Sequence, residues 1–264
     1  MITTVSIYEM YRIINEEHRN PHSVLGMHEV LNGGKEMLSV RVFAPGAKAV
    51  TVIEKKGRKK EFEAQLIHDD GFFEAVITSR KKWFPYTLRI EYNDGNIYET
   101  ADKYSFRPTV SEYDRYLYGA GTHYEIYKKL GAHLCNVDGT DGVSFAVWAP
   151  NAKSISIVGS FNYWDGRTAQ MRMLGNSGIW ELFVPEAAEF DKYKFRIKDR
   201  NGKTVDKSDP FEFYSEIRPM KASVVYDLGV YRWKDSEWLE KREKSDIYRE
   251  PLNIYEVNLG SWMR

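Results

Sequence analysis

Two long stretches of this chain are copies of each other. Residues 25–28 recur as 130–133 and residues 40–45 as 145–150, at a separation of 105 positions (25 to 130). Farther along, residues 86–90 recur as 193–197 and 102–106 as 209–213, at a separation of 107 positions (102 to 209). Solenoid repeats are only about 20–50 residues long. A register kept over this length therefore indicates the duplication of a whole domain.

Within each copy, apolar and polar residues alternate as they do in strands with one buried face. The expected strands come in matched pairs, which are 39–43 with 144–148, 50–53 with 155–158, 72–76 with 179–183, and 86–92 with 193–198. The last pair turns at 93–95 and 201–202, where Asp-Gly and Asn-Gly favour the type I′ turn of a hairpin. Short strands with turn signals about every 8–12 residues predict an all-β fold of two tandem immunoglobulin-like β-sandwiches.

Composition excludes several classes of partner. Lysine and arginine total 38, as do aspartate and glutamate, so no net charge attracts nucleic acid or an anionic membrane. No stretch approaches the roughly 20 apolar residues of a membrane span. Cys135 is the only cysteine and can form no internal disulfide, which suits the reducing cytoplasm. The basic stretch 55–60 is interpreted as a solvated hairpin tip.

Two short helices are expected. Ser6 and Glu9 have the spacing of a capping box, and apolar residues follow at helical spacing. A second helix is predicted at 122–130, where it joins the two copies.

Four segments of the second copy, 145–152, 159–165, 193–195 and 209–210, together resemble a family 48 carbohydrate-binding module. The first copy, through 18–28, resembles the extra N-terminal module of bacterial glycogen branching enzymes, and 116–133 is similar to the junction between the two modules. Residues 251–262 resemble the first barrel strand of those enzymes. By this resemblance, the chain is identified as a member of the 1,4-alpha-glucan branching enzyme family that corresponds to the N-terminal region of these enzymes.

The resemblance implies three parts. These are an N-terminal β-sandwich at 1–115, a family 48 β-sandwich at 116–228, and at 229–264 a linker with the first strand of a truncated (β/α)8 barrel. The implied activity, transfer of alpha-1,4-glucan segments to alpha-1,6 branch points in glycogen biosynthesis, belongs to a catalytic barrel that this chain lacks. The implied partners are alpha-1,4-glucan (glycogen) and that barrel in cis, and no cofactor is implied.

The residues themselves offer no catalytic constellation. A retaining glycosidic mechanism needs two carboxylates about 5–5.5 Å apart, whereas the acidic residues here lie in turns or alternate with lysines. The histidines lack clustered cysteine or carboxylate partners and are interpreted as structural hydrogen-bonding residues, not metal ligands: His18, His28, His123 and His133. We expect the chain by itself to be inactive.

Trp164, Lys194 and Asn162 are the candidate glucan contacts. Alternation directs Phe161 inward and leaves Trp164 at the start of a turn, where its ring can cover one face of a sugar. The resemblance assigns glucan contact to the positions of Trp164 and Lys194. The alternative is that Trp164 packs over the sandwich edge and that Lys194 is an ordinary solvent-facing residue.

Other family contacts are absent. The second stacking tryptophan of the family falls at Lys203 or Thr204, and its asparagine falls at Ala222 or Ser223. The loop of the first copy that matches this turn, 54–61, is charged and has no aromatic residue. That copy is therefore expected to space or orient the rest of the enzyme. Alternation assigns three further aromatic residues to the core: Phe43, Trp148 and Trp180.

Two other functions compete with a branching-enzyme fragment. One is a stand-alone glucan-binding or scaffold protein, and the other is the N-terminal part of a debranching enzyme. The barrel-like strand at 251–262 favours a fragment, because a parallel strand has no purpose without its neighbours. The doubled module favours branching over debranching.

Overall fold

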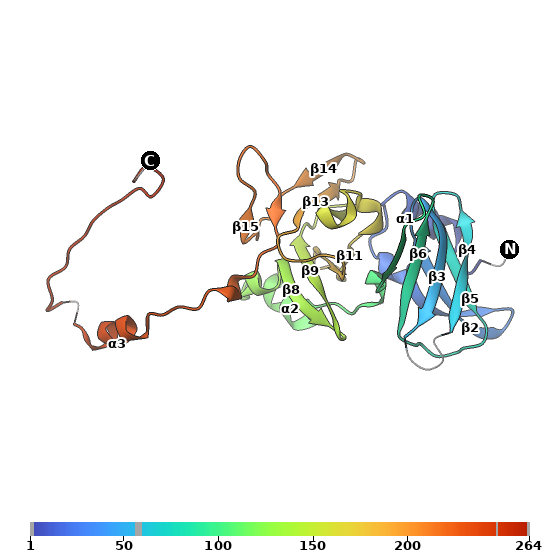
Figure 1. The fold of residues 1–264 in the computed structure, drawn as a ribbon, viewed down its shortest axis with the longest axis horizontal. Coiled ribbons are helices and arrows are strands. Elements are labelled where there is room, and N and C mark those ends of the chain that lie inside the picture. The colour runs from blue at the N-terminus through green and yellow to red at the C-terminus, as the bar shows by residue number, and fades with distance from the viewer. Residues whose placement is uncertain (1–2, 56–59, 247, 263–264) are drawn as a thin grey trace. The chain divides into compact units, whose positions relative to one another are not determined.

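The chain, in a computed structural model that describes residues 3–55, 60–246 and 248–262, divides into two compact units. The first unit is Met1–Asp227 and contains both copies of the repeat, and the second is Leu228–Arg264. The structure is mostly β-sheet with few helices, as predicted (Figure 1). Residues 56–59 of the basic stretch lie outside the described residues, so the interpretation of this stretch as a hairpin tip stays a prediction.

The first repeat forms one antiparallel sheet in the order β1-β2-β5-β4-β3-β6-β7. Because β4 pairs with both β5 and β3, it joins the two halves of the sheet. The elements are α1 (Ile7–Ile14), η1 (Pro21–Ser23), β1 (Gly26–Asn32), β2 (Lys35–Phe43), β3 (Ala47–Glu54), β4 (Glu61–His68), β5 (Phe72–Ile77), β6 (Tyr86–Tyr92), β7 (Ile97–Thr100) and η2 (Lys103–Ser105).

The second repeat has the same strand order in two sheets. One sheet runs β11-β12-β9-β8, and the other runs β10-β13-β16-β15 with β14 paired to β13. A single bridge between Ser156 and Gln170 stands where β3 pairs with β4 in the first repeat. The elements are α2 (Glu112–Gly119), η3 (Ile126–Lys128), β8 (Gly131–Val137), β9 (Thr140–Trp148), β10 (Ser154–Gly159), η4 (Ser160–Asn162), η5 (Gly166–Thr168), β11 (Arg172–Met173), β12 (Ile179–Val184), β13 (Lys192–Lys198), β14 (Thr204–Lys207), β15 (Tyr214–Ser215) and β16 (Ser223–Val224).

Each repeat buries one core between two layers of strands. In the first repeat, apolar residues of β2 and β5 meet those of β3 and β6, and in the second, residues of β9 and β12 meet those of β10 and β13. All eight strands predicted within the two copies lie within observed strands, whereas the predicted strand at 251–262 does not form. Phe43 and Trp180 are buried as predicted, but Trp148 is 48% exposed. Trp148 ends its strand, so its ring turns outward and lies 5.9 Å from the Tyr118 ring.

A short helix covers the outer face of each repeat. Met10 and Ile13 of α1 pack against Phe43 and Phe72, and Ser6 caps α1 by accepting from the Glu9 N–H. The Glu9 carboxylate instead contacts a histidine, so the capping box is only half formed. The sequence prediction missed α2, although its capping box is complete, and the predicted 122–130 helix is only a 3-10 turn, η3.

The expected boundary between residues 115 and 116 divides α2. Tyr118 of α2 packs on a cluster of the second repeat that includes Ala146 and Ile179. Helix α2 thus packs on the core of the second repeat, as α1 packs on that of the first.

The duplication extends to individual hydrogen bonds. The Tyr86 hydroxyl donates to buried Asp102 at 2.5 Å, and the Tyr193 hydroxyl donates to buried Asp209 at 2.6 Å. Gly131 has φ +107° and its missing Cβ would lie 3.1 Å from the Phe211 carbonyl oxygen, so only glycine fits there. Gly26 (φ +87°) is in the same position against the Tyr104 carbonyl.

A buried glutamate anchors the segment that leads into each repeat. Glu74 accepts from Ser39 at 2.6 Å, from Thr3 at 2.8 Å and from the Arg41 guanidinium at 3.1 Å. Burial alone raises the pKa of Glu74, but these donors outweigh it and hold the pKa below its ordinary value. The equivalent Glu181 accepts from the backbone and hydroxyl of a single threonine, Thr109.

The second unit contains η6 (Leu228–Val230) and one helix, α3 (Ser236–Lys244), which the sequence prediction treated as linker. Residues 251–258 form no strand. A barrel strand pairs with neighbours on both sides, and no such partner strand exists among the described residues. No helix in the described ranges is long and apolar enough to cross a membrane.

The Tyr193–Asp209 pair yields a pH-dependent prediction. Burial raises the pKa of Asp209 to about 6, above the unfolded value of about 3.9. Native structure therefore favours the protonated form, and the contribution of Asp209 to stability falls as the pH rises from about 4 to about 6. Above pH 6 the Tyr193 hydroxyl offsets part of that loss. We expect Tyr193→Phe to lower the free energy of unfolding by about 1–3 kcal/mol at pH 8 and by less at pH 5.

Urea denaturation at both pH values measures this difference. Tyr214→Phe is the matched control, because the Tyr214 side chain is 48% exposed and its hydroxyl makes no hydrogen bond within the described ranges. An equal loss at both pH values would contradict a stabilised carboxylate.

Candidate functional site

The turn after β10 is closed by the amide of Asn162. The Asn162 Nδ2 donates to the Ile157 carbonyl at 2.9 Å, and its Oδ1 accepts from the Gly159 N–H at 2.9 Å. The Trp164 N–H donates to the Gly159 carbonyl at 2.9 Å. Both ends of the Asn162 amide are therefore engaged by backbone, so Asn162 shapes the turn.

Two successive aromatic residues in this turn have left-handed backbones. Tyr163 has φ +54° and Trp164 has φ +62°, and neither is glycine. Such conformations are costly and persist where the surroundings fix them, often at ligand sites. Tyr163 is 87% exposed and Trp164 is 39% exposed, whereas Phe161 packs on the core as predicted. The turn thus presents two rings to solvent.

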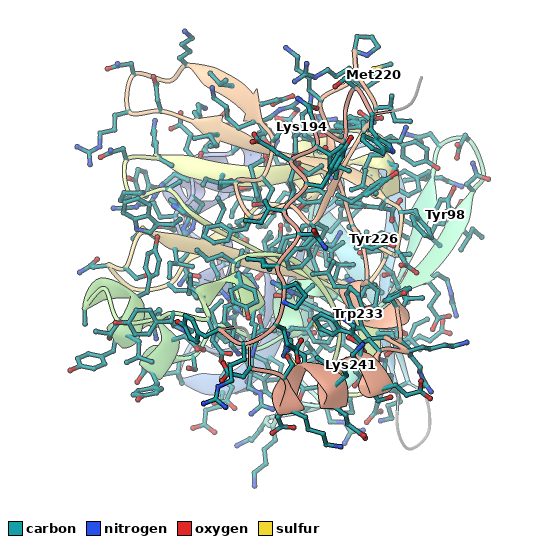
Figure 2. The ribbon with its side chains drawn as sticks, turned by 90° about the vertical axis from the view of Figure 1, so that its left-hand side faces the viewer. Tyr98, Lys194, Met220, Tyr226, Trp233 and Lys241 are labelled. Atoms are coloured by element: carbon teal, nitrogen blue, oxygen red, sulfur yellow. The ribbon has the colours of Figure 1, made fainter. Side chains whose placement is uncertain are left out.

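Lys194 lies on β13, opposite Val158 of β10 and between two inward-facing residues of its strand. Its side chain is on the outer face of the sheet (Figure 2). The other cations of this face are paired: Lys192 with Glu216 at 2.7 Å, Arg196 with Asp206 at 2.9 Å, and Lys198 with Glu17 at 2.9 Å. Within the described part of the chain, Lys194 forms no ion pair.

Backbone pairing brings Trp164 and Lys194 to the same part of the sheet. Trp164 bonds to Gly159, and Gly159 pairs with the residue next to Lys194. Beside them, the hydrogen-bonded Arg167 guanidinium holds the pKa of Asp165 below its ordinary value. An exposed ring, an unpaired cation and an ionised carboxylate are suited to a polyhydroxylated ligand.

The absent family contacts have no structural substitute here. Ala222 is 1% exposed and Ser223 is fully buried, where the Ser223 hydroxyl accepts from the Asp209 N–H. Neither can reach a ligand. Lys203 and Thr204 lie at the exposed β13–β14 hairpin.

The four predicted structural histidines all have protein partners. Through their Nε2 atoms, His18 contacts the Glu9 carboxylate and His123 contacts the Asp114 carboxylate. His28 and His133 contact backbone carbonyls in the same way, those of Leu25 and Leu130. No cluster of three or more potential ligands among His, Cys, Asp and Glu occurs in the residues that the structure describes.

Sequence reasoning missed the tyrosine of this turn. Tyr163 is next to Trp164, and a pair of aromatic residues in a polar loop could have indicated it.

Each repeat matches a known protein family. Residues 6–104 match the family described as alpha-1,4-glucan branching enzyme GlgB, N-terminal domain. Residues 129–212 match Carbohydrate-binding module 48 (Isoamylase N-terminal domain). This second match includes all three candidate glucan contacts.

Curated relatives cover the whole chain. A 1,4-alpha-glucan branching enzyme GlgB from Thermosynechococcus vestitus is 44% identical over 98% of this chain and 34% of its own length. The protein of the same name from Myxococcus xanthus is 43% identical over 97% of this chain and 34% of its own length. The chain thus spans about a third of the length of these relatives.

Among solved structures, a pullulanase from Anoxybacillus sp. LM18-11 complexed with maltotriose is 15% identical and covers 72% of this chain and 26% of its own, with a TM-score of 0.32. That score is too low to carry an argument.

The Asn162 amide supports a stability prediction. We expect Asn162→Ala to lower the free energy of unfolding by about 1–3 kcal/mol, because a buried backbone donor and acceptor lose their partner. Thermal denaturation measures the loss. Asn151→Ala is the control, since Asn151 is exposed and its side chain makes no hydrogen bond in the described ranges. Equal melting temperatures for the two variants would refute this role.

Proposed function

The chain carries the N-terminal domain of the 1,4-alpha-glucan branching enzyme family followed by a family 48 carbohydrate-binding module, and we propose that it is the glucan-binding, non-catalytic N-terminal part of such an enzyme. Its ligand is alpha-1,4-glucan, as in glycogen. Its second role is to orient a catalytic barrel in cis, which would make the branch points.

One observation carries the binding proposal. Trp164 has a left-handed backbone and an exposed ring, and backbone pairing through Gly159 brings it to the same part of the sheet as Lys194, which forms no ion pair among the described residues. A ring packed only to fill the sheet edge would need no such conformation. The aromatic plane covers the C–H face of a glucose unit, and the ammonium group of Lys194 donates to its hydroxyls.

The finer organisation belongs to the same proposal. Both repeats are immunoglobulin-like sandwiches, with domains close to the expected 1–115 and 116–228, and 229–264 leads into the first barrel strand. The shared strand order of the two repeats supports a common sandwich. The single cysteine, Cys135, suits a cytoplasmic protein.

Trp164→Ala is expected to weaken binding of glycogen by about 1–3 kcal/mol, the range measured for aromatic stacking on nucleobases. Lys194→Ala is expected to weaken it less, because the hydrogen bonds of an exposed ammonium replace bonds to water. Affinity electrophoresis in glycogen gels measures both. The control is Trp238→Ala on α3, since Trp238 is 58% exposed and lies in the other unit. Unchanged binding by Trp164→Ala would show that the ring only packs against the sheet edge.

The chain alone is expected to have no branching activity on amylose. Glycosyl transfer of the retaining type needs a nucleophile and an acid/base residue about 5–5.5 Å apart, and the sequence pattern of acidic residues in turns or alternating with lysines does not suggest such a pair. Iodine staining and the count of chain ends released by a debranching enzyme measure branching. Turnover above that of a mock purification would place the catalytic residues inside this chain.

A further inference from the structure

The first repeat contacts the second beside the candidate site. The Thr100 hydroxyl of β7 donates to Glu186 of the second repeat at 3.0 Å, and Lys103 lies 3.3 Å from the same carboxylate. In Figure 1 the yellow turns η4 and η5 face the first repeat. The end of β7 is therefore fixed against the second repeat.

Tyr98 of β7 extends the exposed rings of that turn. Tyr98, labelled in Figure 2, is 49% exposed. Its ring packs edge-on against Tyr92, with centroids 5.9 Å apart. Tyr98 lies on β7 and the exposed Tyr163 follows η4, one of the yellow turns that face the first repeat in Figure 1. In keeping with this placement, the Tyr163 side chain raises the pKa of Tyr98. Three aromatic residues, Tyr98, Tyr163 and Trp164, thus follow one another across the junction of the repeats.

We propose that an alpha-1,4-glucan chain bound at Trp164 continues over Tyr163 onto Tyr98, so that both repeats form one extended glucan site. This inference rests on the proposed function, because it extends the same ligand along the surface. It gives the first repeat a direct contact with glucan, in addition to spacing the enzyme.

The chemistry of the three rings fits a sugar chain. A tyrosine offers an apolar face for the C–H surface of a pyranose and a hydroxyl that both donates and accepts. Tyrosine also loses little conformational entropy on binding, because it has only two rotatable side-chain bonds. Burial raises the pKa of Tyr92, and the nearby carboxylates of Asp94 and Asp165 raise it further. These carboxylates can accept hydrogen bonds from sugar hydroxyls.

The junction fixes the spacing of the rings before the ligand arrives. Tyr163 is fixed by its left-handed turn, and Tyr98 by β7 and the Thr100–Glu186 hydrogen bond. A preorganised surface avoids the ordering cost of binding. A short oligosaccharide needs only the Trp164 end, whereas a longer one reaches Tyr98.

Isothermal titration of the full 264-residue chain with maltotriose and with maltoheptaose tests the extended site. We expect Tyr98→Ala to weaken maltoheptaose binding about tenfold and to leave maltotriose binding unchanged. Tyr98→Phe keeps the ring and is expected to retain most of the affinity. Trp164→Ala weakens both ligands. The matched control is Tyr113→Ala, since Tyr113 is 68% exposed on α2.

The outcomes separate the two proposals. If Trp164→Ala weakens both ligands while Tyr98→Ala binds both like the unsubstituted chain, the extension is wrong and the Trp164 site stands. If the unsubstituted chain binds neither ligand, both proposals fail. A tenfold loss in Tyr98→Ala with an unchanged melting temperature supports the extended site, and a loss that Tyr113→Ala shares overturns it.

Discussion

The buried tyrosine–aspartate hydrogen bond is the interaction on which the arrangement of each repeat depends. In the first repeat, Asp102 accepts from Tyr86 and also from the Tyr104 N–H, which starts η2. The Tyr104 hydroxyl then accepts from the Gln170 N–H of the second repeat at 3.1 Å. Burial raises the pKa of Asp102, so the carboxylate needs these donors in order to stay ionised. One polar network thus links the core of the first repeat to its junction with the second.

The two copies differ in the partner of the buried glutamate and in their outer turns. Both retain the buried glutamate, but its arginine partner comes from β2 in the first repeat and from β11 in the second: Arg41 and Arg172. A buried carboxylate needs a cation nearby, and either of two strands can supply it. This buried pair does not constrain the outer turns. The second repeat presents Tyr163 and Trp164 there, whereas the matching region of the first is highly charged.

In the proposed extended site, the first repeat would contact glucan from another place. Its own matching loop has no tryptophan, whereas the end of its β7 strand is hydrogen-bonded to the second repeat through Thr100 and Glu186. Since two weak contacts on one polymer reinforce each other when their spacing is fixed, a rigid junction increases affinity for long chains more than for short ones. A duplicated domain can in this way acquire a role as the second half of a site.

The sequence by itself determined the duplication, all eight strands predicted within the two copies and the inward position of Phe161, because these follow from alternation with a period of two and from turn residues that act locally. Local patterns failed at ends and at contacts between distant residues. The Trp148 ring turns outward where its strand stops, and helix α2 was missed.

Only the tertiary structure decided how the candidate site is built. It assigned the Asn162 amide to the backbone and, among the described residues, left Lys194 without an ion pair on a face of paired cations. Each of these facts depends on which strands pair and on how one repeat packs on the other. Residue spacing along a single chain carries no information of that kind.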